Sequence, residues 1–219
     1  MPVDAPEVTP TSEPVTVVGI GVSAGSLDPL RAFLAGLPAE PGMAFFVITH
    51  HPPSQPSLLP ELLADRSPLP VREAIEGLAV AADHVYVARP GGDWLLRDGK
   101  LVQQTPEGES GAAAGAEKSP GPPHPVDTFF RSLAAEQAFR SVAILLSGTG
   151  SDGTLGIKVI HSQGGMVMAQ DPETADFDGM PARAIATGMV DYALHPPGDM
   201  PAALVAYGRT AAEQRTGPG

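Results

Sequence analysis

Val15-Thr-Val-Val-Gly-Ile20 is followed at once by Gly21-Val-Ser-Ala-Gly25, and these two stretches decide the fold. The first is a short β-branched run that is typical of a buried strand, and the second has the small residues of a tight turn. Beyond them, leucines recur at helical spacing, at Leu27, Leu30, Leu34 and Leu37. This part of the sequence therefore predicts a strand, a turn and a helix in direct succession.

The same succession recurs twice along the chain. A buried run at 43–48 ends in Thr49-His-His51 and precedes a helix-like stretch at 58–63, and a run at 142–146 ends in the glycine-rich turn 147–153 before another helix. Strands that alternate with helices predict parallel pairing. Residues 93–104 differ, because Asp98-Gly99 at their centre is a two-residue hairpin signal. We therefore expect an α/β fold with a mainly parallel sheet and an antiparallel hairpin appendage.

The domain is expected to span residues 15–208. Residues 1–14 are rich in Pro, Ser, Thr and acidic residues, which cannot form a packed core, and they predict a disordered leader. Residues 105–123 are rich in Gly, Pro, Ala and Glu and predict a low-complexity loop without a catalytic role. The polar end of the chain, 209–219, is expected to be a flexible tail. A length of 219 residues with 42% hydrophobic residues suits one such domain with a sizeable core.

The composition excludes several classes of function. The 25 acidic residues outweigh 13 basic ones and give a net charge of -12, so the basic surface of a nucleic-acid-binding protein is missing. Cysteine is absent, which excludes disulfides and thiolate chemistry. The sequence has neither a signal-peptide pattern nor an apolar stretch of about 20 residues that would span a membrane. We expect a cytoplasmic protein.

Ser23 lies at the centre of a Gly-x-Ser-x-Gly pattern formed with Gly21 and Gly25. In such an elbow the small neighbours allow a sharp turn from strand to helix that presents the serine hydroxyl beside a helix N-terminus. Two other interpretations stay open: Ser23 as the N-cap of the helix, or a dinucleotide-binding turn of the form Gly-x-Gly-x-x-Ala that ends at Ala24. A dinucleotide site would also need an acidic residue at the end of the second strand, where the sequence has Thr49-His-His51.

Two adjacent histidines, His50 and His51, end the second predicted strand. Consecutive residues of an extended segment point to opposite faces, so the two rings cannot easily share a metal ion. The other histidines are scattered without metal-binding spacing and comprise His84, His124, His161 and His195. We therefore expect no metal site, and one of the two adjacent rings is available as a base.

Asp152 lies in the turn after the third buried run. Either Asp152 or Ser151 is expected to cap the helix that follows, and this role is compatible with catalysis. Ligands of an open parallel sheet bind outside the carboxyl ends of its strands, which places Asp152 at the same end as Ser23 and His51. A carboxylate there can orient His51 and stabilise the imidazolium that forms when this ring takes the Ser23 proton. The alternatives on a looser loop are Asp171, Asp176 and Asp178.

Several ordered blocks of the sequence resemble the catalytic domain of the chemotaxis protein-glutamate methylesterases, the CheB type. The blocks are Val18-Gly-Ile-Gly-Val-Ser-Ala-Gly25, Ile48-Thr-His-His-Pro52, Pro125-Val-Asp127, Leu146-Ser-Gly-Thr-Gly-Ser-Asp-Gly-Thr154 and Gly179-Met-Pro-Ala-Arg-Ala-Ile185. The similarity runs from about Val15 to Tyr207. It implies a doubly wound, mainly parallel sheet with helices on both faces and an antiparallel hairpin.

By this resemblance the nucleophile is Ser23, the base is His51 and the orienting carboxylate is Asp152. The resemblance also implies that the backbone N–H groups of Thr149 and Ala24 bind the oxyanion, and it makes Met180 and Pro181 candidates for a substrate loop. The implied reaction is hydrolysis of γ-glutamyl methyl esters on methyl-accepting chemotaxis receptors, with deamidation of selected receptor glutamines and no cofactor. A methyltransferase or kinase of the same pathway is a further expected partner, and the membrane is reached only through the receptor.

The sequence departs from the family pattern at several positions. Ala24 stands where some members have threonine, Ser26 where they have a second glycine, His50 where we expect glutamine, and Thr149 where the best-known members have methionine. The phosphorylatable receiver domain of many members is not expected, because it cannot fit in 14 leading residues. A non-catalytic binding module with the same fold is the alternative function, and the intact set of Ser23, His51 and Asp152 argues against it.

Overall fold

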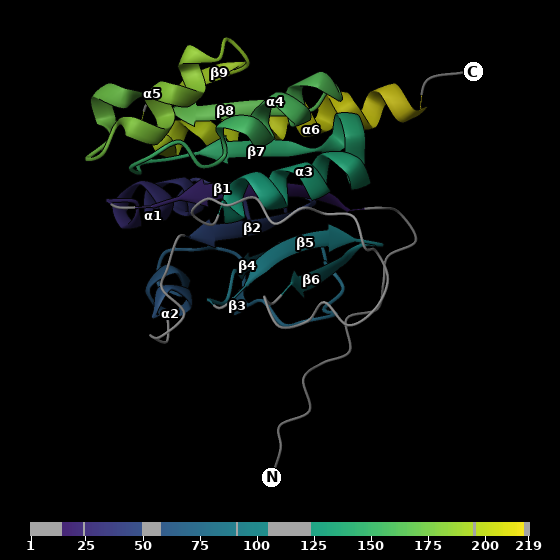
Figure 1. Ribbon diagram of the computed structural model, residues 1–219. Helices are drawn as coiled ribbons and strands as arrows, with labels where there is room; N and C mark the ends of the chain where they lie inside the picture. Colours follow the sequence, from purple (N-terminus) through teal and green to yellow (C-terminus); the bar gives the residue numbers. More distant parts are fainter. Residues whose placement is uncertain are drawn as a thin grey trace.

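The structure is a computed structural model that describes residues 15–23, 25–49, 58–90, 92–104, 124–194 and 196–216. A seven-stranded sheet forms its centre, and every strand pairs in parallel with its neighbours. From top to bottom in Figure 1 its strands are β9 (Tyr192–Leu194), β8 (Met166–Gln170), β7 (Val142–Leu145), β1 (Thr16–Val22), β2 (Met43–Thr49), β4 (His84–Val87) and β3 (Val71–Glu73). The prediction of a parallel α/β sheet is confirmed.

Helices cover both faces of the sheet. One face packs against α1 (Leu27–Ala35), α2 (Leu59–Ala64) and α6 (Met200–Thr216), and the other against α3 (Pro125–Gln137), α4 (Thr154–Ser162) and α5 (Gly179–Ala186). Three short 3-10 turns complete the described elements: η1 (Ala138–Arg140), η2 (Pro172–Thr174) and η3 (Pro197–Asp199). Along β1, Val17 enters one core and Val18 the other, as alternation along a strand requires. The fold is therefore the expected doubly wound arrangement with two apolar cores.

The antiparallel hairpin consists of β5 (Asp93–Arg97) and β6 (Lys100–Gln104). Its turn is Asp98-Gly99, and both residues have positive φ values, 50° and 68°, as the tight turn of a two-residue hairpin requires. Trp94 is buried and meets Phe46 of β2 edge-on, with 6.0 Å between the ring centroids. The hairpin lies in front of the sheet in Figure 1 and covers part of the same face as α3. The expected hairpin is thus confirmed, and it contributes to the core.

The order of the strands sets the position of the site. The chain leaves β1 toward β2 on one side, and β7 lies against β1 on the other, so the topology reverses between β1 and β7. Gly21 of β1 is paired with Leu145 of β7, and Val22 with Thr49 of β2. The three strands therefore end close together at one edge, where α/β sheets of this type bind their ligands.

Some elements differ from the sequence-based prediction. The edge strands β3 and β9 were not predicted. Helix α6 continues to Thr216, beyond the expected end of the domain at residue 208. The predicted leader 1–14 and loop 105–123 lie outside the described residues. None of the described helices combines the length and the apolar character needed to cross a membrane.

Candidate active site

Ser23 directly follows β1 and is only partly exposed. Its N–H donates to the carbonyl oxygen of Ser147 at 3.2 Å, and its own carbonyl oxygen accepts a hydrogen bond from Ser26 Oγ at 2.6 Å. The N-cap of α1 is Ser26, three residues further along the chain. The interpretation of Ser23 as the cap of this helix is therefore wrong, and its place beyond the strand end remains that of an elbow serine.

The loop after β7 lies against Ser23 and is held in place by a buried polar contact. The N–H of Ser147 donates to Gln170 Oε1 at 2.9 Å, and both residues are fully buried. Gly148 follows, and a Cβ atom placed on it would lie 2.8 Å from the Cβ of Ser23 and overlap the sulfur of Met180. Only glycine permits this close approach of the loop backbone to the candidate nucleophile.

Thr149 comes next in the loop and is exposed. Its backbone N–H donates no hydrogen bond to another residue that the structure describes, and it follows directly on the glycine that approaches Ser23. A free amide next to the nucleophile is what an oxyanion donor requires. Ala24, the other oxyanion candidate, lies outside the described residues.

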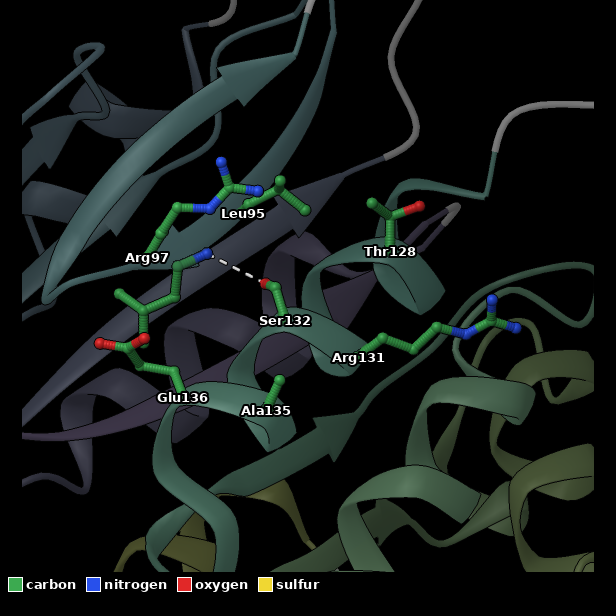
Figure 2. Close-up of a pocket in the computed structure, with 8 residues that line it drawn as sticks. Leu95, Arg97, Thr128, Arg131, Ser132, Ala135 and Glu136 are labelled. Atoms are coloured by element: carbon green, nitrogen blue, oxygen red, sulfur yellow. Dashed lines mark hydrogen bonds between the residues drawn. The ribbon is translucent and has the colours of Figure 1, made fainter. Parts of the chain in front are cut away.

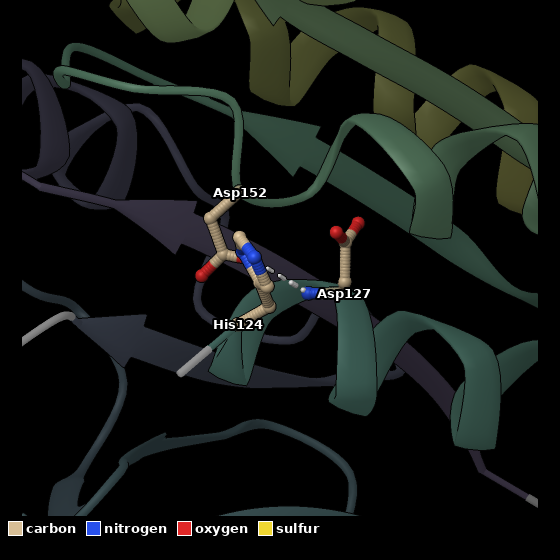
Figure 3. Close-up of side chains that lie close together, drawn as sticks. All are labelled: His124, Asp127 and Asp152. Atoms are coloured by element: carbon tan, nitrogen blue, oxygen red, sulfur yellow. Dashed lines mark hydrogen bonds and ion pairs between the residues drawn. The ribbon is translucent and has the colours of Figure 1, made fainter. Parts of the chain in front are cut away.

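Asp152 stabilises the N-terminus of α3, as Figure 3 shows. Its carboxylate accepts the N–H groups of Val126 at 3.1 Å and Asp127 at 3.0 Å, which are in the first turn of α3, and that of Gly153 at 2.9 Å. In return, the Asp127 carboxylate accepts the N–H of Gly156 in the first turn of α4 at 2.6 Å. The prediction that Asp152 or Ser151 caps the helix that follows was wrong, because the N-cap of α4 is Gly153 and the two helices exchange their capping carboxylates.

Burial raises the pKa of the Asp152 carboxyl above its ordinary value, and the charge of Asp127 acts in the same direction. The hydrogen bonds from the Asp127 and Val126 amides lower it, as does His124, but burial is the largest cause. The carboxyl therefore takes up a proton at a higher pH than an exposed aspartate does. Any activity that needs ionised Asp152 is lost as the pH falls through this raised pKa.

His124 is the histidine that the structure places beside Asp152, with 3.8 Å between Nδ1 and the nearest carboxylate oxygen. Its side chain is 47% exposed, whereas that of Asp152 is 11% exposed. His124 was predicted to be one of the scattered histidines; its position immediately before Pro125-Val-Asp127 was the available signal for a role at this site. His50 and His51 lie outside the described residues, so the choice of His51 as the base stays a prediction.

His124, Asp127 and Asp152 also offer ligand atoms within 4.8 Å of one another, a set that a divalent cation could use. Both carboxylates are already hydrogen bonded to backbone N–H groups at the ends of α3 and α4. A cation would have to compete with these donors for the same oxygen atoms. We therefore interpret the two carboxylates of the cluster as caps of the N-termini of α3 and α4 and not as metal ligands.

The remaining predicted residues, Met180 and Pro181, lie in the first turn of α5. Met180 is fixed by a hydrogen bond from its N–H to the carbonyl oxygen of Gly148, and both it and Pro181 are buried. Of the alternative carboxylates, Asp171 accepts the N–H of Glu173 in its own turn, and Asp176 and Asp178 are exposed. Among the candidates for the orienting carboxylate, only Asp152 is largely buried and joined to the loop beside Ser23.

A groove of about 470 Å³ lies between α3 and the hairpin strand β5 (Figure 2). Arg97 and Arg131 stand on its walls, and Ser132 at its base accepts the N–H of Leu96 at 3.0 Å. Neither Ser23 nor Asp152 lines this groove. The groove is therefore separate from the loops that carry Ser23 and Asp152.

Asp152→Asn is expected to lower ester hydrolysis by up to ~10⁴-fold, because an amide cannot hold a neighbouring imidazole in the tautomer that a general base needs. Steady-state kinetics on a small methyl ester measure this loss. The matched control is Asp127→Asn, which changes the other carboxylate of the exchanged pair and should keep the rate within about tenfold. If both variants lose activity together with thermal stability, Asp152 acts only as a helix cap.

Comparison with known proteins shows which family the chain belongs to. The chain matches the family model described as CheB methylesterase over residues 18–204. It is 35% identical over 207 residues to protein-glutamate methylesterase/protein-glutamine glutaminase 1 of Myxococcus xanthus, covering 90% of this chain and 55% of that protein. Protein-glutamate methylesterase/protein-glutamine glutaminase 6 of Anaeromyxobacter dehalogenans is 37% identical over 186 residues, which are 82% of this chain and 51% of that protein. The chain thus spans about half the length of these relatives.

The fold has a counterpart among solved structures. The crystal structure of the Thermotoga maritima CheB methylesterase catalytic domain superimposes with a TM-score of 0.75 at 28% sequence identity. The match covers 88% of this chain and 98% of that domain. Because the family model matches residues 18–204, most of the chain, the chain belongs to the CheB methylesterase family, of which it represents the catalytic domain.

Proposed function

We propose that this protein hydrolyses γ-glutamyl methyl esters on methyl-accepting chemotaxis receptors, releasing methanol, and that it also deamidates selected receptor glutamines. One observation supports this above all. The turn after β1 carries Ser23 and the turn after β7 carries Asp152, and Gly148 brings these two turns into contact where the sheet topology reverses. The names of the two relatives combine the same two activities.

The proposed reaction begins when Ser23 Oγ attacks the ester carbonyl carbon while His51 takes the hydroxyl proton. Asp152 holds the protonated ring, and the backbone N–H groups of Thr149 and Ala24 bind the oxyanion. His51 then returns the proton to the leaving oxygen, so methanol departs and a glutamyl ester of Ser23 remains. Water activated by the same histidine hydrolyses this ester to glutamate and free serine. None of these steps requires a cofactor.

The proposed partners follow from this reaction. The substrate is a receptor protein, and the enzyme that adds the methyl groups is expected to belong to the same pathway, as is a kinase. We infer action from the cytoplasmic side, with contact to the membrane only through the receptor.

Two measurements test the proposal. Receptor membranes that carry radiolabelled methyl groups should release labelled methanol when incubated with this protein, and a serine-directed probe should label Ser23. A protein that binds methylated receptors, releases no methanol and is not labelled at Ser23 would instead be a non-catalytic binding module. The proposed function would then be wrong.

Replacement of residues 105–123 by a short Gly-Ser linker is expected to leave the catalytic rate nearly unchanged. The segment joins β6 to α3, and its composition cannot hold a catalytic site. Loop length itself has a small effect on stability, about 0.6 kcal/mol for each doubling. Turnover of a small methyl ester is the measurement, and a loss of more than about tenfold would show that the segment takes part in catalysis.

A further inference from the structure

Phe177 is a partly exposed aromatic residue beside the candidate nucleophile. It lies in the segment between η2 and α5, and 45% of its surface is exposed. Isolated exposed apolar residues are common on proteins and carry no meaning alone. Two further observations distinguish Phe177: its backbone is fixed to the loop that contacts Ser23, and its ring packs on the elbow itself.

The backbone of Phe177 is held by hydrogen bonds to residues of the β7 loop. Its N–H donates to Ser147 Oγ at 3.1 Å, and its carbonyl oxygen accepts the N–H of Gly148 at 2.9 Å. Ser147 in turn accepts the N–H of Ser23 on its own carbonyl oxygen. Ser147 therefore connects Ser23 to Phe177, and the backbone of Phe177 is held close to the candidate nucleophile.

The ring packs directly on Gly25, the second glycine of the elbow. A Cβ atom on Gly25 would lie 2.7 Å from a ring carbon of Phe177 and 2.8 Å from the Cβ of Asp176, and Gly25 has a φ of +67°. Any other residue there would push the ring away as well as strain the turn. One edge of the ring therefore lies against the elbow, and part of the ring stays exposed to solvent.

The charges around the ring favour a neutral partner. Asp176 and Asp178 flank Phe177, and both are exposed. A glutamyl methyl ester and an apolar side chain are uncharged, whereas the glutamate product is an anion that these carboxylates repel. An apolar surface with an acidic border therefore suits the substrate better than the product.

We propose that Phe177 is a substrate-contact residue that determines specificity for the protein substrate: its ring receives an apolar side chain of the receptor segment that carries the ester. This inference rests on the proposed function. The contact lies beside the scissile bond and buries the open part of the ring when the receptor binds. A small ester without a neighbouring apolar side chain gains nothing from it.

The test compares two substrates and two measurements. Phe177→Ala should raise the KM for methylated receptor about tenfold, the effect expected for losing a half-buried aromatic contact, and leave kcat/KM for a small methyl ester within about threefold. Phe177→Leu should recover most of the affinity. The matched control is Phe139→Ala, since Phe139 is 48% exposed but precedes β7 at the opposite edge of the sheet. This control should leave both the KM for methylated receptor and the kcat/KM for the small ester unchanged.

Receptor binding keeps the inference separate from the proposed reaction. In the Ser23→Ala background, Phe177→Ala should weaken binding to methylated receptor about tenfold, and this holds whether or not the parent protein releases methanol. Unchanged receptor binding would overturn the role of Phe177. An equal loss on receptor and small ester would also overturn it, since the ring would then act on the nucleophile or on the ester group. A parent protein without methanol release overturns only the proposed function.

Discussion

Ser23→Ala is expected to lower methyl-ester hydrolysis by about 10⁴- to 10⁶-fold while the fold stays intact. The residues of a triad act as a unit, so removal of the nucleophile leaves only the rate that binding and the oxyanion donors supply. Ser23 also contributes backbone hydrogen bonds to Ser147 and Ser26, and alanine retains them because they involve main-chain atoms of residue 23. The loss should therefore be chemical and not structural.

The measurement is kcat/KM on a small methyl ester, with circular dichroism to confirm folding. Ser26→Ala is the matched control, because the Ser26 hydroxyl donates to the Ser23 carbonyl oxygen and belongs to the same turn. Its activity should stay within about tenfold of the parent. If Ser23→Ala itself keeps activity within tenfold, the assignment of the nucleophile is wrong.

The fold could be predicted where local sequence and tertiary contacts give the same signal. The β-branched run of β1 is central in the sheet and buried on both faces, and Asp98-Gly99 is a local turn signal that the structure confirms. The edge strands β3 and β9 have only three residues each, too few for a periodic pattern. Their strand conformation comes from pairing with β4 and β8.

The candidate site was predictable in part for a related reason. Strand ends collect at one edge of a parallel sheet, so the turns that carry Ser23 and Asp152 could be brought together from the sequence alone. The exchange of capping carboxylates between α3 and α4 joins residues 25 to 29 positions apart, and no local pattern reports it. For the same reason the proximity of His124 to Asp152 was missed. In the sequence Phe177 is a single apolar residue in a loop, and only the structure shows its contact with Gly25.

Three histidines compete for the role of the base, two from the sequence and one from the structure. His84 and His161 are excluded by position, since His84 begins β4 at the amino edge of the sheet and His161 is in the last turn of α4. His124 is half exposed, and its ring nitrogen is 3.8 Å from the Asp152 carboxylate, beyond hydrogen-bond distance. His195, like His50 and His51, lies outside the described residues, and the adjacent pair His50 and His51 stays the predicted source of the base.

His51→Gln is expected to lower ester hydrolysis by about 10⁵-fold or more, because glutamine cannot accept the Ser23 proton at neutral pH. His50→Gln and His124→Gln should each keep turnover within about tenfold. Neighbouring residues at a strand end face opposite ways, so only one ring of the pair can turn toward Ser23. His124 is 3.8 Å from the Asp152 carboxylate and half exposed, so solvent weakens any electrostatic interaction between the two side chains. Steady-state kinetics on the three variants, each checked for folding, separate the possibilities. An inactive His50→Gln with an active His51→Gln would show that His50 is the base and that the predicted register at the end of β2 is wrong by one residue. An inactive His124→Gln would instead identify His124, just before the N-terminus of α3, as the base that Asp152 orients.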